Sequence, residues 1–139
     1  MSTLSDLLWY LDNVPLRQRT PKDPQVYGLS TNALTVYHIT APENVDSIKA
    51  NGIKAKSSRQ SYDRPNAVYF FAARTDINPA NIAILGLADG YRVITVTIPF
   101  SAVIEHMVWD GLYNATFTSS YSAVQYLGDI PATWITSIA

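Results

Sequence analysis

The segment YRVITVTI, residues 91 to 98, is the clearest strand in the sequence and the feature that most constrains the fold. Successive side chains of a strand point to opposite faces, so Ile94, Val96 and Ile98 share one face while threonines occupy the other. Pro99 ends this strand because proline has no amide hydrogen for a further ladder bond. Shorter runs of β-branched and aromatic residues predict strands at residues 34 to 38, 53 to 55, 67 to 71, 122 to 127 and 133 to 138.

The helices predicted from the sequence are short and lie between these strands. The leucines within residues 4 to 11 recur at the i, i+3, i+4 and i+7 spacing of one helical face. Residues 42 to 51 begin with proline and are followed by Gly52, which suits a left-handed C-terminal cap. A third helix is expected from residue 79 to residue 90, while residues 101 to 120 favour no single element. The expected fold class is therefore α+β, weighted toward strands.

Length and proline spacing suggest how the chain is organised. Prolines at positions 15, 21 and 24 interrupt regular structure after the first helix. We therefore expect an N-terminal helix with a proline-containing arm at residues 1 to 33, followed by a domain at residues 34 to 139. A chain of 139 residues can bury one hydrophobic core of reasonable size, so one functional site is expected.

Composition excludes several classes of function. The chain has no cysteine and only two histidines, His38 and His106, so we expect no disulfide, no thiolate catalysis and no metal site. A net charge of −1 lacks the basic excess on which nonspecific nucleic-acid binding depends. No apolar run approaches the roughly 20 residues of a membrane span, and the N-terminus lacks the basic start of a signal peptide. We expect a cytoplasmic protein without a membrane partner.

Two segments carry the strongest functional signal. They are VYHITAPENVDSIKANGIKA, residues 36 to 55, and NAVYFFAA, residues 66 to 73. Together they resemble the opening of ADP-ribosyltransferase-like proteins of the His-Tyr-Glu type, in which a strand ending in Tyr-His-x-Thr, a helix, a glycine and a Val-Tyr-Phe strand follow in order. The asparagine six residues after the histidine is similar to that of DNA-modifying toxins in this superfamily. The resemblance implies an ADP-ribosyltransferase-like split mixed β-sheet with short helices, and NAD+ as co-substrate.

The resemblance also implies roles for individual residues. His38 would hydrogen-bond the nicotinamide ribose, Thr40 and Asn44 would hold nearby groups, and Tyr69 would stack on the nicotinamide ring. A loop arginine would meet the pyrophosphate through charge-assisted bonds. The candidates for this contact are Arg64 and Arg59. A single histidine after a strand is more often structural, so these roles depend on the joint pattern rather than on any one residue.

The third element of the family, a glutamate near the start of a late strand, is missing from the segment SYSAVQYLGDIPATWI. Gln125 is the expected substitute and completes the predicted catalytic set with His38 and Tyr69. An alignment shifted by two residues places Ala123 there instead, on the same face of the strand. A glutamine can hydrogen-bond a ribose but lacks the negative charge that stabilises an oxocarbenium ion. Other carboxylates that could enter the cleft are Asp129, the best of them, Glu105 and Asp110.

Two functions remain open from the sequence. The first is an NAD+-dependent ADP-ribosyltransferase that modifies a macromolecule, either protein or nucleic acid, in conflict between a bacterium and its phage or competitor. The second is a catalytically degenerate module that binds NAD or ADP-ribose and acts as a sensor, inhibitor or structural protein. An NAD-dependent RNA 2′-phosphotransferase is less favoured, because such an enzyme needs several cationic residues around RNA phosphate and the chain has only 10 Lys and Arg.

Overall fold

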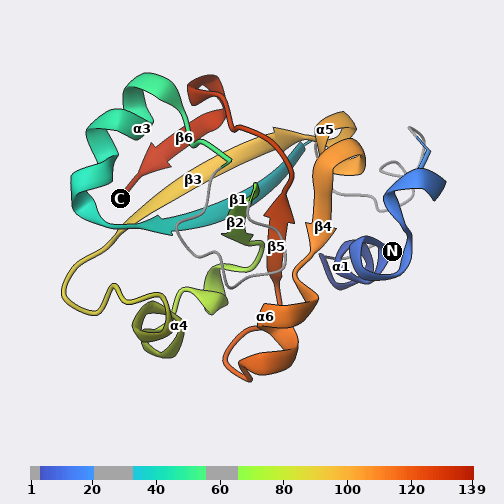
Figure 1. Cartoon of the computed structure of the whole chain (residues 1–139), viewed down its shortest axis with the longest axis horizontal. Coiled ribbons are helices and arrows are strands. Elements are labelled where there is room, and N and C mark those ends of the chain that lie inside the picture. The colour runs from blue at the N-terminus through green and yellow to red at the C-terminus, as the bar shows by residue number, and fades with distance from the viewer. Residues whose placement is uncertain (1–3, 21–32, 56–65) are drawn as a thin grey trace.

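The computed structural model describes residues 4–20, 33–55 and 66–139. Within these stretches six strands join in one sheet (Figure 1). The strands are β1 (Ala33–Thr40), β2 (Val68–Phe71), β3 (Arg92–Pro99), β4 (Met107–Trp109), β5 (Ala123–Tyr126) and β6 (Ile135–Ile138). Their order across the sheet is β4-β5-β2-β1-β3-β6. The predicted strands are confirmed with two exceptions. At residues 53 to 55, Ile53 makes only a single bridge to Ile130. The last strand begins at Ile135 rather than at residue 133, because Ala132–Trp134 form a 3-10 turn.

Neighbouring strands run antiparallel throughout this sheet, which corrects the expectation of a mixed sheet. That expectation came from the family resemblance, whereas β3 carries the opposite signal in its own residues. Ile94, Val96 and Ile98 are buried, and Thr95 and Thr97 between them are half-buried. Such clean alternation is typical of antiparallel strands, while strands of parallel sheets are apolar on both faces.

The sheet nearly divides between β1 and β2. Strand β1 pairs with β3 along all eight of its residues. With β2 it shares a single registered pair, Tyr37 opposite Phe71. In Figure 1, β1 and β3 run across the molecule, whereas β2, β4 and β5 lie at a steep angle to them. The sheet therefore consists of two three-stranded halves, and a fork opens between β1 and β2.

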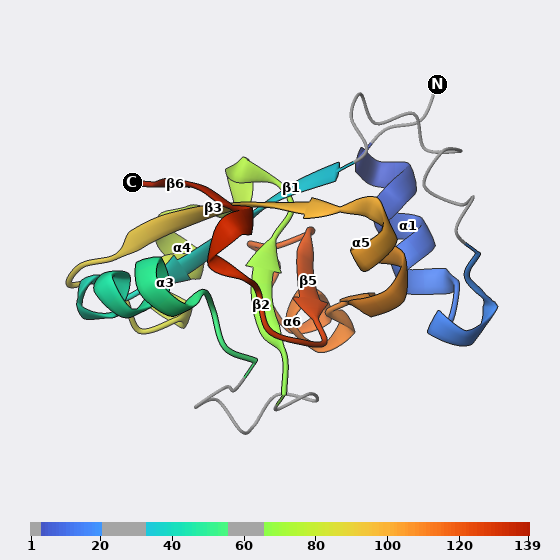
Figure 2. The same ribbon diagram turned by 90° about the horizontal axis from the view of Figure 1, so that it is seen from above.

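Short helices surround the sheet. They are α1 (Leu4–Asn13), α3 (Val45–Asn51), α4 (Pro79–Ile84), α5 (Phe100–His106) and α6 (Gly111–Thr116). Short 3-10 turns add η1 (Leu16–Gln18), η2 (Pro42–Asn44), η3 (Arg74–Asp76) and η4 (Ala132–Trp134). In both views α1 and α5 lie at one end of β3, and α3 and α4 lie toward the other (Figures 1 and 2).

The helix expected from residue 79 to residue 90 is shorter than predicted. It ends at Ile84, because Gly86 rather than Gly90 takes the positive φ, at +75°, that terminates a helix. The amide of Leu87 then donates to the carbonyl of Ile82 across this turn. The unassigned residues 101 to 120 contain α5, β4 and α6, three elements too short for a periodic pattern to separate.

Two hydrophobic clusters lie on opposite faces of the sheet. The main cluster contains Val36 of β1 and Phe70 of β2, together with the buried face of α1. The smaller cluster contains Ile39 and Phe71 of the same two strands. Side chains alternate along a strand, so Val36 and Phe70 point to one face of the sheet, and Ile39 and Phe71 point to the other. The fork between β1 and β2 therefore lies between two packed layers that hold both strands in position.

Candidate functional site

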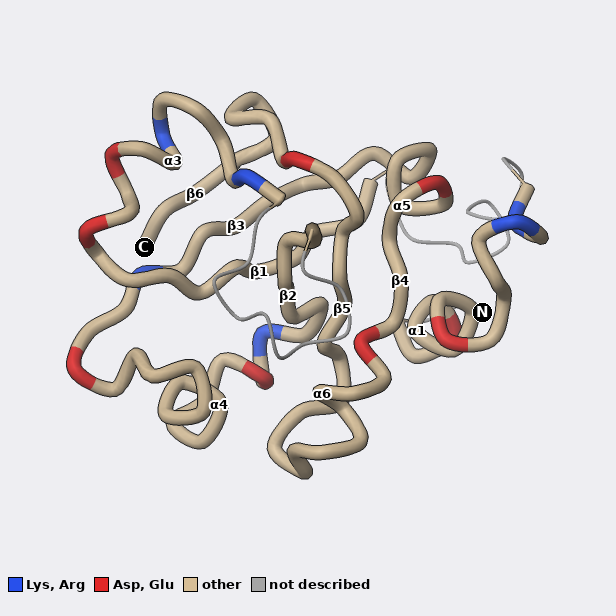
Figure 3. The backbone as a smooth tube through the Cα atoms, viewed as in Figure 1, with Lys and Arg blue, Asp and Glu red and all other residues tan. Residues whose placement is uncertain are grey.

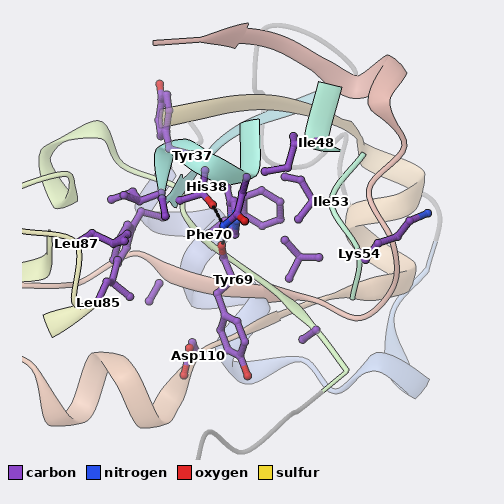
Figure 4. A pocket seen from close by; sticks show the side chains of 18 of the residues that line it. Tyr37, His38, Ile48, Ile53, Lys54, Tyr69, Phe70, Leu85, Leu87 and Asp110 are labelled. Atoms are coloured by element: carbon purple, nitrogen blue, oxygen red, sulfur yellow. Dashed lines mark hydrogen bonds between the residues drawn. The ribbon is translucent and has the colours of Figure 1, made fainter. Parts of the chain in front are cut away.

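A cleft opens where β1 and β2 separate (Figure 4). Beyond the pair of Tyr37 and Phe71 the two strands share no registered pair, and residues 37 to 40 and 67 to 71 form its walls. Helix α3, residues 52 to 54 and the residues just after α4 add to the lining, and Asp110, Tyr113 and Ala123 complete it. The volume of about 430 Å³ lies within the range of small-molecule sites. The cleft is therefore a consequence of the divided sheet.

His38 bridges the two strands inside this fork. Its Nδ1 lies 2.8 Å from the backbone oxygen of Tyr69 (Figure 4). A carbonyl oxygen can only accept a hydrogen bond, so Nδ1 carries the hydrogen and donates it. In the neutral ring Nε2 then keeps its lone pair and accepts hydrogen bonds. His38, which lines the cleft, thus keeps Nε2 as a hydrogen-bond acceptor.

The surroundings of His38 keep its ring neutral. Burial lowers the pKa of His38 below its usual 6.5, and the hydrogen bond to the Tyr69 carbonyl raises it by a smaller amount. The ring of Phe70 packs against it edge-on, with the two ring centres 5.7 Å apart. An apolar neighbour of this kind stabilises the neutral imidazole relative to the charged one.

We expect the protein to lose stability as the pH falls below about 6.5, because the folded chain binds the His38 proton less readily than the unfolded chain does. The contribution of neutral His38 to the free energy of unfolding is fully present above pH 6.5, and it is lost as the pH falls toward the lowered pKa of His38 in the folded state. The His38→Asn variant keeps an amide that can donate to Tyr69 but does not titrate. Urea unfolding at about pH 7.5 and about pH 5.5 measures the effect. Equal losses in wild type and variant would contradict it.

Thr40 and Asn44, two of the site residues predicted from the sequence, also line the cleft. Thr40 ends β1 and is buried, while Asn44 ends the turn η2 that follows it. The Asn44 side-chain amide donates to Thr40 Oγ1 over 3.1 Å. Thr40 lies two residues and Asn44 six residues after His38, so this one motif contributes several residues to the same side of the cleft.

The register of β2 and β5 places the two candidate positions of the missing glutamate. Tyr69 lies opposite Gln125, and Phe71 lies opposite Ala123, and opposite residues of an antiparallel pair share a face. Tyr69 and Ala123 line the cleft. Gln125 is 0% exposed, lies outside the lining and has Val108 of β4 opposite it. Of the two candidate positions, Ala123 therefore reaches the cleft and Gln125 does not.

The three acidic residues considered from the sequence differ in where they lie relative to the cleft. Asp110 lines the cleft and is the only acidic residue among its described lining residues. Asp129 lies outside the lining, where it accepts from the Ala55 amide over 2.8 Å and lies 3.9 Å from the Lys54 ammonium group. Glu105 is exposed on the surface beside His106. Asp129, the best candidate from the sequence, is therefore a structural residue of its turn.

A buried carboxylate that the sequence did not single out holds the β5 side of the cleft. Asp76 is 1% exposed, and its Oδ2 accepts from the backbone amides of Tyr121 and Ser122 over 3.1 and 2.9 Å. The hydroxyl of Ser122 donates to the same oxygen over 2.6 Å, and that of Ser120 over 3.3 Å. Because Ser122 directly precedes Ala123, this network ties the chain after β2 to the start of β5. The segment SSYS supplies the donors, but no pattern in the sequence pairs it with Asp76.

Positive charge at the cleft is sparse. Arg64 and Arg59, the predicted partners of a pyrophosphate, lie outside the described residues. Lys54 is the one basic residue among the described residues of the lining. Arg74 stacks on the ring of Tyr37, 4.9 Å from its centre. Figure 3 shows Lys and Arg scattered over the described chain without a continuous basic stripe.

Comparison with known proteins gives no family for this chain: no protein-family model matches the sequence, and no curated protein matches it either. In the described part of the chain no three His, Asp or Glu side chains gather in a way that could hold a metal ion. Across the same residues, none of the helices is both long and apolar enough to span a bilayer. The cleft geometry is therefore the main basis for any functional proposal.

Proposed function

We propose that the cleft binds NAD+ and that the protein is an NAD+-dependent ADP-ribosyltransferase acting on a macromolecule. One observation carries the proposal. His38, Thr40 and Asn44 from the first motif and Tyr69 from the second, which the sequence marked on separate segments, line the same cleft. A structural role for each residue on its own would not require them to meet around one cavity.

The geometry suits the chemistry of NAD+ cleavage. The reaction requires that the nicotinamide and its ribose be held while positive charge develops at the glycosidic carbon. Nε2 of His38, as a neutral acceptor, fits a ribose hydroxyl. The ring of Tyr69 extends from the strand wall into the cleft (Figure 4) and offers a face for the nicotinamide. These contacts orient the substrate and need no protein nucleophile.

A second function has its own support. Ala123 is the residue of β5 that lines the cleft, and it is one of the two positions that the resemblance offers for the glutamate, so β5 supplies no carboxylate to the cleft. The alternative is therefore a module that binds NAD+ or ADP-ribose without turnover. We further propose that the protein acts in the cytoplasm, in conflict between a bacterium and its phage or competitor. The acceptor is either a protein or a nucleic acid. The scattered cations favour a protein over a nucleic acid.

Calorimetry with NAD+ and ADP-ribose tests the binding, and mass spectrometry of a lysate incubated with labelled NAD+ tests the transfer. Transfer or NAD+ hydrolysis by the wild type supports the enzyme. Binding without either supports the module. Absence of binding to both ligands would overturn the proposed function in both forms.

We expect the Tyr69→Ala variant to bind NAD+ about 5- to 150-fold more weakly, because loss of an aromatic stacking partner costs about 1–3 kcal/mol. The matched control is Tyr91→Ala, which removes an exposed tyrosine from outside the cleft lining. Titration calorimetry on both variants, with unfolding curves to confirm their folding, measures the difference. Equal affinities would remove Tyr69 from the site.

A further inference from the structure

We propose that Asp110 supplies the negative charge that position 123 lacks, as the catalytic carboxylate of this cleft. The inference rests on the proposed function, since it concerns the cleavage of NAD+ bound between His38 and Tyr69. The catalytic carboxylate then comes from the residue between β4 and α6, whereas the family resemblance led us to expect it on β5.

Strand register places Asp110 next to Ala123. The backbone amide of Asp110 donates to the carbonyl of Ala123 over 3.0 Å. Val108 of β4 pairs with Gln125 of β5, and Asp110 follows two residues later, in the row of Ala123. Residues that occupy one row on neighbouring strands have Cβ atoms roughly 5 Å apart. Asp110 therefore stands one strand away from the alanine.

The Asp110 side chain reaches the cleft rather than the outer surface. The residue is 3% exposed and belongs to the cleft lining. Figure 4 shows its carboxylate at the end of the cleft where the Tyr69 ring lies, across from Ile48 and Ile53. A carboxylate shielded from water acts more strongly on nearby charge than an exposed one. Because the carboxylate lies beside the Tyr69 ring, on which the nicotinamide is proposed to stack, it can act on the ribose attached to that nicotinamide.

Asp110 also has a structural contact, which defines a suitable variant. Its Oδ1 accepts from the amide of Tyr113 over 3.0 Å and caps α6. A carboxylate offers about four lone-pair sites, so capping and a ribose contact are compatible. Asparagine caps helices as well as aspartate does. Asp110→Asn therefore keeps the cap and removes the negative charge.

Asp110 accepts a hydrogen bond from a hydroxyl of the nicotinamide ribose, and its charge stabilises the cation that forms at C1′. The bond between C1′ and the nicotinamide nitrogen breaks, and its electron pair leaves with neutral nicotinamide. The hydroxyl of the acceptor, or of water, bonds to C1′ and releases its proton to solvent. No oxidant or reductant takes part.

The experiment compares NAD+ hydrolysis, NAD+ affinity and thermal unfolding for wild type, Asp110→Asn and Glu105→Gln, a control that neutralises an exposed carboxylate. We expect Asp110→Asn to lower kcat about 100-fold or more while changing the Kd for NAD+ by less than about threefold. The control should retain wild-type values. Asp110→Ala, which also removes the cap, should lose the same activity with a lower melting temperature.

The outcomes separate this inference from the proposed function. Wild-type turnover with undiminished activity in Asp110→Asn overturns the role of Asp110 and leaves the enzyme proposal intact. Wild-type binding without turnover also overturns it and favours the binding module. No NAD+ binding by the wild type overturns the proposed function, and the role of Asp110 with it.

Discussion

Replacing Gly52 with alanine is expected to destabilise the protein by about 4 kcal/mol, combining backbone strain and a steric clash. Gly52 follows α3 with φ +75° and ψ −167°, a region that is open to glycine and to almost no other residue. A Cβ there would lie 2.0 Å from the carbonyl oxygen of Ile130. The chain would have to move apart at the bridge between Ile53 and Ile130. Because Gly52 and Ile53 line the cleft, NAD+ binding should weaken as well.

Gly86 provides a matched control for this substitution. Its φ is also +75°, yet an added Cβ would meet no atom within 4 Å. Gly86→Ala should therefore cost only the strain of a left-handed alanine, about 1 kcal/mol. Urea unfolding of both variants measures the difference. Similar losses in the two would show that the close approach of Ile130 does not constrain position 52.

The Asp76→Ala variant is expected to lose about 4 kcal/mol of unfolding free energy, because it leaves buried donors without their acceptor. Two backbone amides and two serine hydroxyls donate to Asp76 Oδ2. Asp76→Asn keeps the shape but turns one acceptor into a donor, and we expect about half that loss. Since the network positions the start of β5, the shape of the cleft beside Ala123 depends on it.

Asp89, which is exposed, is the control for this second prediction. Asp89→Ala should change the unfolding free energy by less than about 0.5 kcal/mol. Chemical denaturation of the three variants, together with NAD+ titration of those that fold, gives both readouts. A loss below about 1 kcal/mol for Asp76→Ala would mean that water satisfies the serine donors in its place.

Most of the secondary structure was predictable because it depends on local rules. The alternation along residues 92 to 99 and the leucine spacing along residues 4 to 11 each depend on neighbours within a few positions. The same holds for the turn and helix that start at Pro42. The predictions failed where two local signals competed, and no element could be assigned where the elements were very short. Gly86 and Gly90 could each end α4, and residues 101 to 120 hold elements of three to seven residues.

The site was predictable only in part, for the same reason. His38, Thr40 and Tyr69, which line the cleft, could be singled out because they lie in compact motifs. Asp110 and Asp76 have no such motif, and their places in and beside the cleft arise from segments that meet in space. Arg19, outside the cleft lining, is a further example of contacts between distant segments. Its guanidinium donates to carbonyls of Leu11 and Val14 in its own segment and of Ile104 in α5. No spacing rule connects residues 85 positions apart.

The sequence by itself determined an α+β chain with the strands that carry His38 and Tyr69, because strand alternation and turn chemistry are properties of neighbouring residues. Only the tertiary structure decided that β1 and β2 separate after one pair, that Gln125 is buried and Ala123 faces the cleft, and that Asp110 stands beside it. These features depend on register and on contacts between distant segments. A shift of one residue in the pairing of β2 with β5 would turn a different set of side chains toward the cleft.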